Sequence, residues 1–368
     1  MMKDKTLAEI LDPLTKPARL VEPQEGGAVR CYACAHRCII KPGKRGVCQV
    51  RFNKDGQLYA PWGYVAAANP DPIEKKPFMH FLPGSIALTI GMLGCNFHCD
   101  FCQNWVSSQA LRDPASESSG SYIQEIQPDQ LIDYASRQTI PIICSSYNEP
   151  LITSEWAMDI FKLAKEAGMK TAYVSNGYAT PEVLKALQPY LDGFKVDLKS
   201  MQQKNYSALG GKLQPVLDSI KLAKELGMWV EVVTLVIPDY NDSNEELWEA
   251  ARYLTSLSPE IPWHVTAFYP TYQRTDTPPT PASTLQRAAE IGQEAGLQFV
   301  YAGNRPGRVG SLENTYCPTC QALLIERQGY TILDYQITVE GTCPKCQHKI
   351  AGVWIDQPEA VSGGGLGF

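Results

Sequence analysis

From residue 85 onward, short apolar runs rich in β-forming residues alternate with segments whose apolar positions recur at helical spacing. The expected strands are Ile86–Ile90, Ile140–Ser145, Thr171–Ser175, Phe194–Leu198, Trp229–Ile237, His264–Phe268 and Gln298–Tyr301. The expected helices are Asp129–Ser136, Ser154–Ala167, Glu182–Leu187, Leu217–Leu226, Glu245–Leu257 and Thr284–Ala295. Repeated strand–helix units predict a parallel sheet with right-handed crossovers. Six or seven units are too few to close an eight-unit barrel, so we predict an α/β fold with a partial (βα)6-type TIM barrel.

The pattern changes on both sides of this core. Before it, an amphipathic helix is expected from Leu7 to Leu14, and a hairpin around Asn53–Gly56. After it, the stretch Gly329–Val339 is rich in β-forming residues. We therefore predict an N-terminal cysteine module (1–62), a barrel (63–310) and a C-terminal module (311–368) whose last seven residues are disordered.

Composition and charge limit the classes of protein to which this chain can belong. The 368 residues are 44% hydrophobic with a net charge of −6, and no apolar run is long enough to span a membrane. The N-terminus has no apolar signal core, so we expect a cytoplasmic protein with no membrane partner. The absence of a long basic run argues against a broad nucleic-acid surface. Twelve cysteines in such a chain are expected to be metal ligands rather than disulfides.

Three of these cysteines directly follow the first expected barrel strand. Cys95, Cys99 and Cys102 have the spacing Cys-x3-Cys-x2-Cys, with Gly91 and Gly94 allowing a sharp turn before them. Three thiolates on one loop can hold three irons of a 4Fe–4S cube and leave the fourth iron open. A zinc site or three buried thiols are the alternatives.

Two further cysteine groups flank the barrel. The tail carries two Cys-x2-Cys pairs, Cys317 with Cys320 and Cys343 with Cys346, which predict a zinc ribbon rather than four unrelated thiols. The N-terminal group is compatible with zinc or an auxiliary iron–sulfur cluster, and His36 could replace one of its thiolates. This group consists of Cys31, Cys34, Cys38 and Cys48, whereas the isolated Cys144 is expected in the core.

The central triplet resembles the signature of the radical S-adenosylmethionine (SAM) superfamily. The strand before it and Phe101, the aromatic before the third cysteine, also fit that pattern. The resemblance implies a 4Fe–4S cluster whose open iron is chelated by SAM. An external donor, flavodoxin- or ferredoxin-like, would reduce the cluster. The cluster would then cleave SAM to a 5′-deoxyadenosyl radical that abstracts hydrogen from a substrate.

Polar residues at the expected strand ends suit a SAM pocket. Glu149 is the candidate for the ammonium group of SAM. Candidates for its ribose and carboxylate are Ser175, Asn176 and His264, and strand four contributes Asp197 and Lys199. The alternatives are turn-stabilising polar residues and a surface ion pair. The charges within 71–81 could belong to a solvated loop or line the mouth of the site.

The core is also similar to the activating enzymes of glycyl-radical proteins, except that Tyr147-Asn148 stands where those enzymes carry two glycines. Nearly the whole chain resembles the AmmeMemoRadiSam-system radical SAM enzyme, on motifs such as Asp71–Pro77, Tyr147–Pro150 and Pro262–His264. That resemblance implies Memo-type and AMMECR-type proteins as partners. A glycyl-radical activase acting on a protein backbone is the first alternative function, and a metal scaffold or electron carrier is the second.

Overall fold

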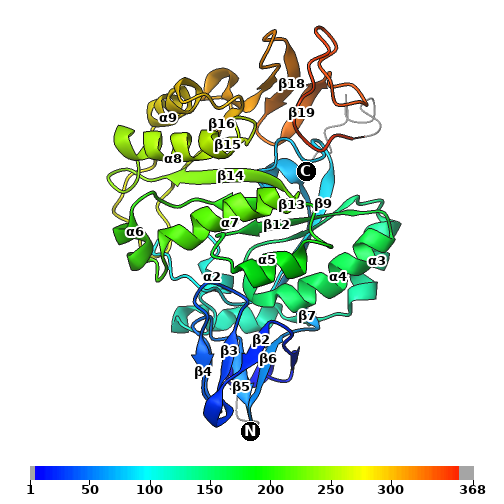
Figure 1. The fold of residues 1–368 in the computed structure, drawn as a ribbon, viewed down its shortest axis with the longest axis vertical. Helices are drawn as coiled ribbons and strands as arrows, with labels where there is room; N and C mark the ends of the chain where they lie inside the picture. The colour runs from blue at the N-terminus through cyan, green and yellow to red at the C-terminus, as the bar shows by residue number, and fades with distance from the viewer. Residues whose placement is uncertain (1–4, 356–368) are drawn as a thin grey trace.

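An eight-stranded sheet forms the centre of the molecule, in the order β16-β15-β14-β13-β12-β11-β9-β8. The computed structural model describes residues 5–355 (Figure 1). Neighbouring strands run parallel except β8, which pairs antiparallel with β9 at one edge. The strands are β8 (Ala67–Pro72), β9 (Ile86–Gly91), β11 (Ile142–Ser145), β12 (Lys170–Ser175), β13 (Gly193–Asp197), β14 (Trp229–Val236), β15 (Trp263–Ala267) and β16 (Val300–Gly303).

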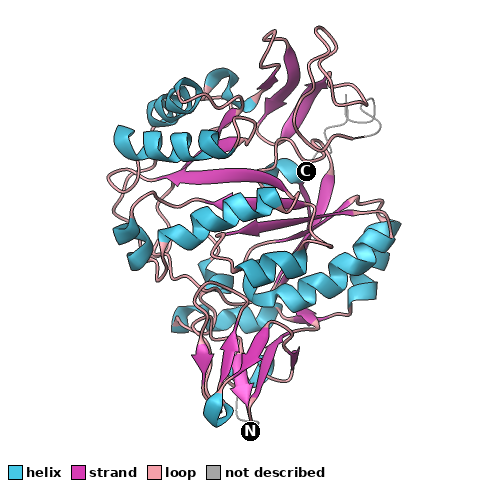
Figure 2. Ribbon diagram, in the orientation of Figure 1, coloured by secondary structure: helices cyan, strands magenta, loops and turns pink. Residues whose placement is uncertain are grey.

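Helices connect the parallel strands and lie along one face of the sheet (Figure 2). The crossovers are α3 (Pro128–Arg137), α4 (Ser154–Glu166), α5 (Pro181–Leu187), α7 (Leu213–Glu225), α8 (Asn244–Leu257) and α9 (Ala282–Glu294). Two short helices are α2 (Trp105–Ser108) and α6 (Gln203–Ala208), and the 3-10 turns include η3 (Pro114–Tyr122), η4 (Pro150–Thr153) and η5 (Gly310–Glu313). The predicted α/β fold with a partial barrel is confirmed.

Strand register divides the side chains into two sets. One set packs against the helices and includes Leu88, Tyr173 and Trp263 in the main hydrophobic cluster. The other set faces the concave interior, where Cys144 pairs with Thr89 and Ala172, and Lys195 pairs with Glu231. This face therefore combines apolar side chains with buried polar and charged ones.

The segment between β8 and β9 closes this interior from below. After the 3-10 turn η2 (Ile73–Lys75), Phe78 and Phe81 turn inward and pack on Ala87, Ile142 and Ala172. Both phenylalanines are fully buried. The closed floor leaves the carboxyl ends of the strands as the open side.

The N-terminal module consists of two small antiparallel sheets beside the carboxyl ends of the strands. It is attached there by Ala35 N–H, which donates to the Tyr178 carbonyl (2.9 Å), and by Arg37, which holds Glu182 with two hydrogen bonds (2.9 and 2.7 Å). Its elements are α1 (Leu7–Leu11), β1 (Thr15–Pro17), β2 (Val21–Pro23), η1 (Glu25–Gly27), β3 (Val29–Cys31), β4 (Ile39–Ile40), β5 (Phe52–Lys54) and β6 (Gln57–Pro61), followed by β7 (Tyr64–Val65), which pairs with β10 (Gln124–Glu125).

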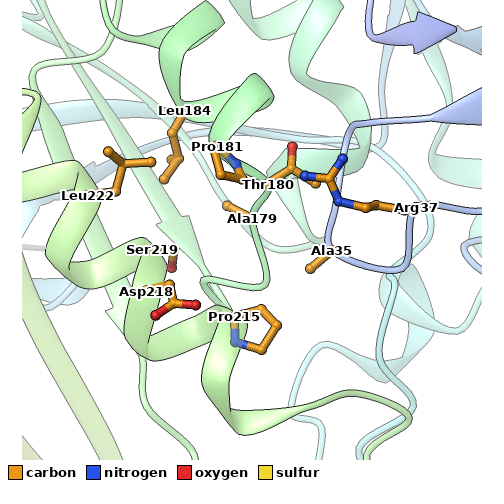
Figure 3. A pocket seen from close by; sticks show the side chains of 10 residues that line it. All are labelled: Ala35, Arg37, Ala179, Thr180, Pro181, Leu184, Pro215, Asp218, Ser219 and Leu222. Carbon is orange, nitrogen blue, oxygen red and sulfur yellow. The ribbon is translucent and has the colours of Figure 1, made fainter.

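A pocket of about 220 Å³ lies where this module meets α5 and α7 (Figure 3). Ala35 and Arg37 line it from the module, and Thr180 and Asp218 line it from the barrel. None of the residues predicted for SAM or metal binding lines it.

The C-terminal module lies at the opposite end of the molecule (Figure 1). It is a three-stranded antiparallel sheet of β17 (Thr315–Tyr316), β18 (Leu323–Gln328) and β19 (Thr331–Tyr335). Arg327 donates to the Met79 carbonyl (2.9 Å), and the His80 ring contacts the Ala351 carbonyl (2.7 Å). The module therefore packs directly on the segment that closes the barrel floor. The predicted disordered end, 362–368, lies outside the described residues.

Candidate active site

The three central cysteines lie on the loop that follows β9. Burial raises the pKa of Cys95, Cys99 and Cys102, and neighbouring thiolates raise the pKa of Cys95 and Cys99 further. For Cys99 the pKa is about 12. Thiols with a raised pKa ionise at neutral pH only when a cation or metal ion compensates their charge, as it does for thiolates that bind a metal.

Arg112 holds the backbone of this loop in place. Its guanidinium donates to the carbonyls of Cys95 and Phe97 at 2.7 Å each, and to the carbonyl of Val47 in the N-terminal module. His36 of the same module contacts the Asn96 carbonyl at 2.9 Å. The cysteine loop is thus fixed from both the barrel and the N-terminal module.

Glu149, Ser175 and Asn176 come together at the carboxyl ends of β11 and β12, as predicted. The Glu149 carboxylate accepts hydrogen bonds from Ser175 Oγ (2.7 Å), Asn176 N–H (2.8 Å) and Leu151 N–H (3.1 Å). Burial raises the pKa of this carboxyl to about 7, although these three donors pull it down. A carboxylate has room for about four hydrogen bonds, so one further donor can be accommodated.

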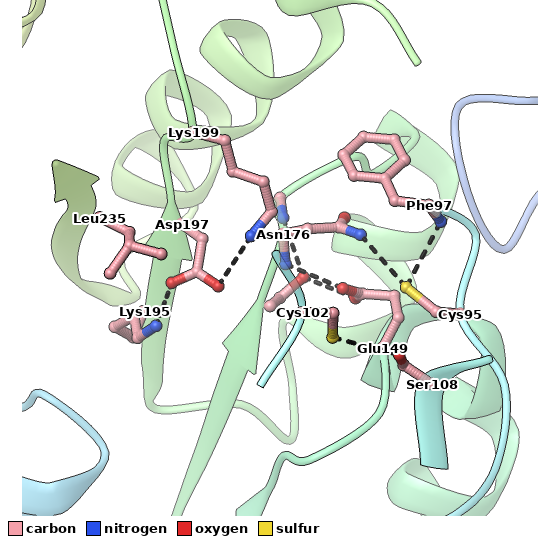
Figure 4. Close-up of polar contacts among 12 residues, drawn as sticks. Cys95, Phe97, Cys102, Ser108, Glu149, Asn176, Lys195, Asp197, Lys199 and Leu235 are labelled. Carbon is pink, nitrogen blue, oxygen red and sulfur yellow. Dashed lines mark hydrogen bonds and ion pairs between the residues drawn. The ribbon is translucent and has the colours of Figure 1, made fainter. Parts of the chain in front are cut away.

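Asn176 connects this group to the cysteine loop (Figure 4). Its Nδ2 donates to Asn96 Oδ1 at 2.7 Å and lies 3.9 Å from Cys95 Sγ. Asn96 was not predicted as a site residue. It stands directly after the first cysteine of the triplet, and that position was the available signal.

Asp197 and Lys199 extend the site along β13. Asp197 lies between the ammonium groups of Lys195 and Lys199 (Figure 4). The positive charge of Lys199 lowers the pKa of Cys99 and Cys102 against the effect of burial. Phe101 lies 6.0 Å from Lys199 Nζ, measured to the ring centroid. The predicted residues Asp197 and Lys199 thus lie beside the loop that carries Phe101, and Asp197 connects them to the unpredicted Lys195.

The structure does not bring His264 to this group. His264 is the second residue of β15, so it lies near the amino end of its strand. Its Nε2 is 2.7 Å from Glu231 Oε2, and its ring stacks on Tyr301 with centroids 5.3 Å apart. The expected contact with SAM grouped His264, at the start of its expected strand, with residues at other strand ends, whereas His264 belongs to a buried network that leads toward the C-terminal module.

The N-terminal cysteines share one buried neighbourhood. Burial raises the pKa of Cys34 well above its usual value, and the thiolates of Cys31, Cys48 and Cys38 raise it further. The fully buried Arg51 guanidinium lowers the pKa of Cys31 and Cys48. A cation beside these thiols favours their ionised, metal-binding form, although Arg51 is also paired with Glu155. The identity of the metal stays a prediction.

The four tail cysteines form a compact group. The sulfurs of Cys317, Cys320, Cys343 and Cys346 all lie within 4.8 Å of one another. Four thiolates at such distances match a closed tetrahedral metal site. This grouping confirms the predicted metal-binding cluster, and zinc remains the expected occupant.

Comparison with known proteins decides the family. A model described as the radical SAM superfamily matches residues 89–254. The uncharacterized protein MJ0808 of Methanocaldococcus jannaschii is 40% identical over 338 residues, which are 91% of this chain and 98% of that protein. This chain belongs to the radical SAM superfamily. Radical SAM proteins use a 4Fe–4S cluster and SAM, and the three thiols on the loop after β9, with the positive charge of Lys199 acting on two of them, fit such a cluster.

Two activating enzymes are also similar to this radical SAM protein. The pyruvate formate-lyase-activating enzyme of Clostridium pasteurianum is 25% identical over 179 residues, 48% of this chain and 71% of that enzyme. A solved domain of the pyruvate-formate lyase-activating enzyme from Bacteroides vulgatus is 22% identical, covers 44% of this chain and 98% of that domain, and has a TM-score of 0.38. Within the described residues, no helix has the length and apolar character needed to cross a membrane.

Proposed function

We propose that this chain binds a 4Fe–4S cluster through Cys95, Cys99 and Cys102, and SAM beside it. When bound, these groups would supply one-electron cleavage of SAM to a 5′-deoxyadenosyl radical that abstracts hydrogen from a substrate. The observation that carries the proposal is the position of Asn176, which donates its N–H to Glu149 and lies 3.9 Å from Cys95 Sγ on the cysteine loop.

The residues of the chain have separable roles in this proposal. Glu149, with capacity for one further hydrogen bond, would accept the ammonium group of SAM. Asn176 holds the loop at Asn96, and Lys199 offsets the negative charge of the thiolates. The closed floor under the barrel interior excludes water from below.

The test is reductive SAM cleavage by anaerobically reconstituted protein, with dithionite as electron donor. We expect 5′-deoxyadenosine from the wild type and none from Cys95→Ala, Cys99→Ala or Cys102→Ala. His98→Ala is the matched control in the same loop, because His98 is exposed and not placed in the site. Cleavage that survives any of the three cysteine changes would overturn the cluster assignment. A wild type that never cleaves SAM would favour a metal scaffold or electron carrier.

A glycyl-radical activase is the second candidate. The similarity to the activating enzyme of Clostridium pasteurianum favours it. The chain would then act on the backbone of a partner protein. A glycyl-radical signal in electron paramagnetic resonance, formed on a purified candidate partner, would distinguish this activity from turnover of a small molecule.

A further inference from the structure

The barrel interior contains two aspartates that each bridge two lysines. Asp71 on β8 holds Lys75 Nζ and Lys76 Nζ at 2.7 Å each. Asp197 at the end of β13 holds Lys195 and Lys199. The side chains of Lys76 and Lys195 are each only 5% exposed. Within these two groups the ammonium groups outnumber the carboxylates by two, and the nearby Glu231 carboxylate is bound instead by His264 and the N–H groups of Met79 and His80.

Both buried ammonium groups face the same part of the interior. Burial raises the pKa of the Cys144 thiol to about 12, whereas the positive charges of Lys76 and Lys195 act to lower it. Cys144 packs with Phe78 and Phe81 of the closed floor. Lys76 and Lys195 therefore stand just above the apolar floor and below the cysteine loop.

Tyr147 forms a wall beside Lys76. Its hydroxyl donates to Asp71 Oδ2 at 2.7 Å, and Lys76 Nζ lies 4.5 Å from its ring centroid. The residue has a φ of 69°, which is uncommon outside glycine, and it precedes Glu149 by two positions. The ring is only partly buried, so it borders open space.

One of the two surplus charges already has a role. Lys199 faces the thiols of Cys99 and Cys102, where it offsets the negative charge of the ligands. The other surplus lies at Asp71, and in the described part of the chain Lys76 forms an ion pair with Asp71 alone. A buried ammonium that shares its one carboxylate with a second lysine is poorly compensated. An anionic group of a ligand would supply a second negative charge for the two ammonium groups at Asp71.

We propose that Lys76 and Tyr147 form the substrate-anchoring site and take an anionic group, a carboxylate or a phosphate, of the substrate. The site lies at the floor of the barrel, so the rest of the substrate would extend upward toward the cysteine loop. This inference rests on the proposed radical SAM function. It adds the chemical class of the substrate, which the cluster and SAM do not determine.

The experiment is equilibrium dialysis of radiolabelled inorganic phosphate and acetate with the reconstituted, SAM-loaded full chain. We expect at least one anion to bind, and Lys76→Met to weaken that binding by about tenfold or more. Tyr147→Phe should weaken it in the same direction. Lys76→Arg should keep affinity within about threefold, so the charge can be tested even if Lys76→Met folds poorly.

Lys162→Met is the matched control, because Lys162 is an exposed lysine on α4 and belongs to neither lysine pair. It should change affinity by less than about threefold. Binding of phosphate alone would indicate a phosphorylated substrate, and binding of acetate alone a carboxylic acid. An equal loss in Lys162→Met and Lys76→Met, or no binding of either anion by a wild type that cleaves SAM, would overturn the inference. A wild type that does not cleave SAM would instead refute the proposed function.

Discussion

Gly91 and Tyr147 lie in close contact where the candidate site begins. A Cβ atom on residue 91 would lie 2.8 Å from the Ser146 carbonyl oxygen and 2.9 Å from Tyr147 Cβ, both shorter than side chains tolerate. Because Ser146 and Tyr147 fill the space beside residue 91, only glycine fits at that position without displacing them.

We expect Gly91→Ala to displace the Ser146–Tyr147 turn and to destabilise the protein by about 1–3 kcal/mol. SAM affinity should fall as well, since Glu149 follows the turn directly. Thermal unfolding and SAM titration would measure both effects. In the control Gly120→Ala, the nearest contact is the flexible end of Leu7 at 3.2 Å, so a change of similar size there would contradict the steric argument.

If Glu149 binds the ammonium group of SAM as proposed, its buried carboxyl should make SAM binding depend on pH. Because burial raises its pKa to about 7, the group is largely neutral below that pH and ionised above it. An ammonium ligand prefers the ionised form. SAM affinity should therefore rise as pH increases through about 7 and level off above it. Glu149→Gln should bind SAM more weakly and with a flatter profile. An unchanged profile in that variant would exclude Glu149 as the titrating group.

At the scale of residues, the sequence predicted those site positions that follow strand ends. Glu149, Ser175 and Asn176 meet because the carboxyl ends of adjacent parallel strands share one edge of the sheet. Asp71 and Lys76 were left undecided between a solvated loop and the site. Their place in the interior depends on the path of the segment under the barrel, which no local pattern encodes.

At the scale of elements, the alternating pattern located the strands and crossover helices to within a few residues. The expected strand Trp229–Ile237 is β14, Trp229–Val236, and the expected helix Glu245–Leu257 is α8, Asn244–Leu257. Strand β8 was missed because its sequence, Ala-Ala-Asn-Pro-Asp-Pro, reads as a turn. Prolines are tolerated there because β8 is an edge strand with one unpaired side.

The segment joining β8 to β9 contains a carboxyl that is costly to ionise. Burial raises the pKa of Glu74 from 4.5 to about 7, while Arg327 acts to lower it. Its Oε1 accepts a hydrogen bond from Gly84 N–H (2.7 Å), and its Oε2 has no partner. Between these pH values the folded chain keeps a proton that the unfolded chain has lost. This group therefore makes stability fall as pH rises from about 4.5 to about 7.

Glu74→Gln replaces the carboxyl with a neutral amide and should therefore remove this loss of stability at higher pH. We expect the variant to match the wild type near pH 5 and to exceed its unfolding free energy by up to about 3 kcal/mol near pH 8. Denaturant unfolding at the two pH values measures the difference. A variant that is less stable than the wild type at high pH would show that Glu74 is ionised and compensated in the folded protein.

At the scale of the whole molecule, three cysteine groups predict a defined metal content. One cube on the central triplet should give about four irons per chain, and two closed thiolate sites about two zincs. If the N-terminal group instead holds a second cluster, the content should be about eight irons and one zinc. Elemental analysis of anaerobically purified protein separates the two outcomes.

The double variant Cys317→Ala, Cys320→Ala tests which of these metal ions the tail cysteines bind. It should lose about one zinc and no iron. Loss of iron from this variant would mean that the tail group is not an independent structural site.

The attachment of the C-terminal module to the barrel floor has a consequence for the order of folding. Residues 78–81 leave the ribosome before any parallel strand of the barrel, yet His80 contacts Ala351, which lies 271 residues later. Contacts of such sequence separation form late and slowly. Until the last module has been synthesised, the phenylalanines beneath the barrel lack their final cover, Val353. We therefore expect Phe78 and Phe81 to stay partly uncovered in the nascent chain until Val353 has been synthesised, and a chaperone that shields them to raise the yield of folded protein.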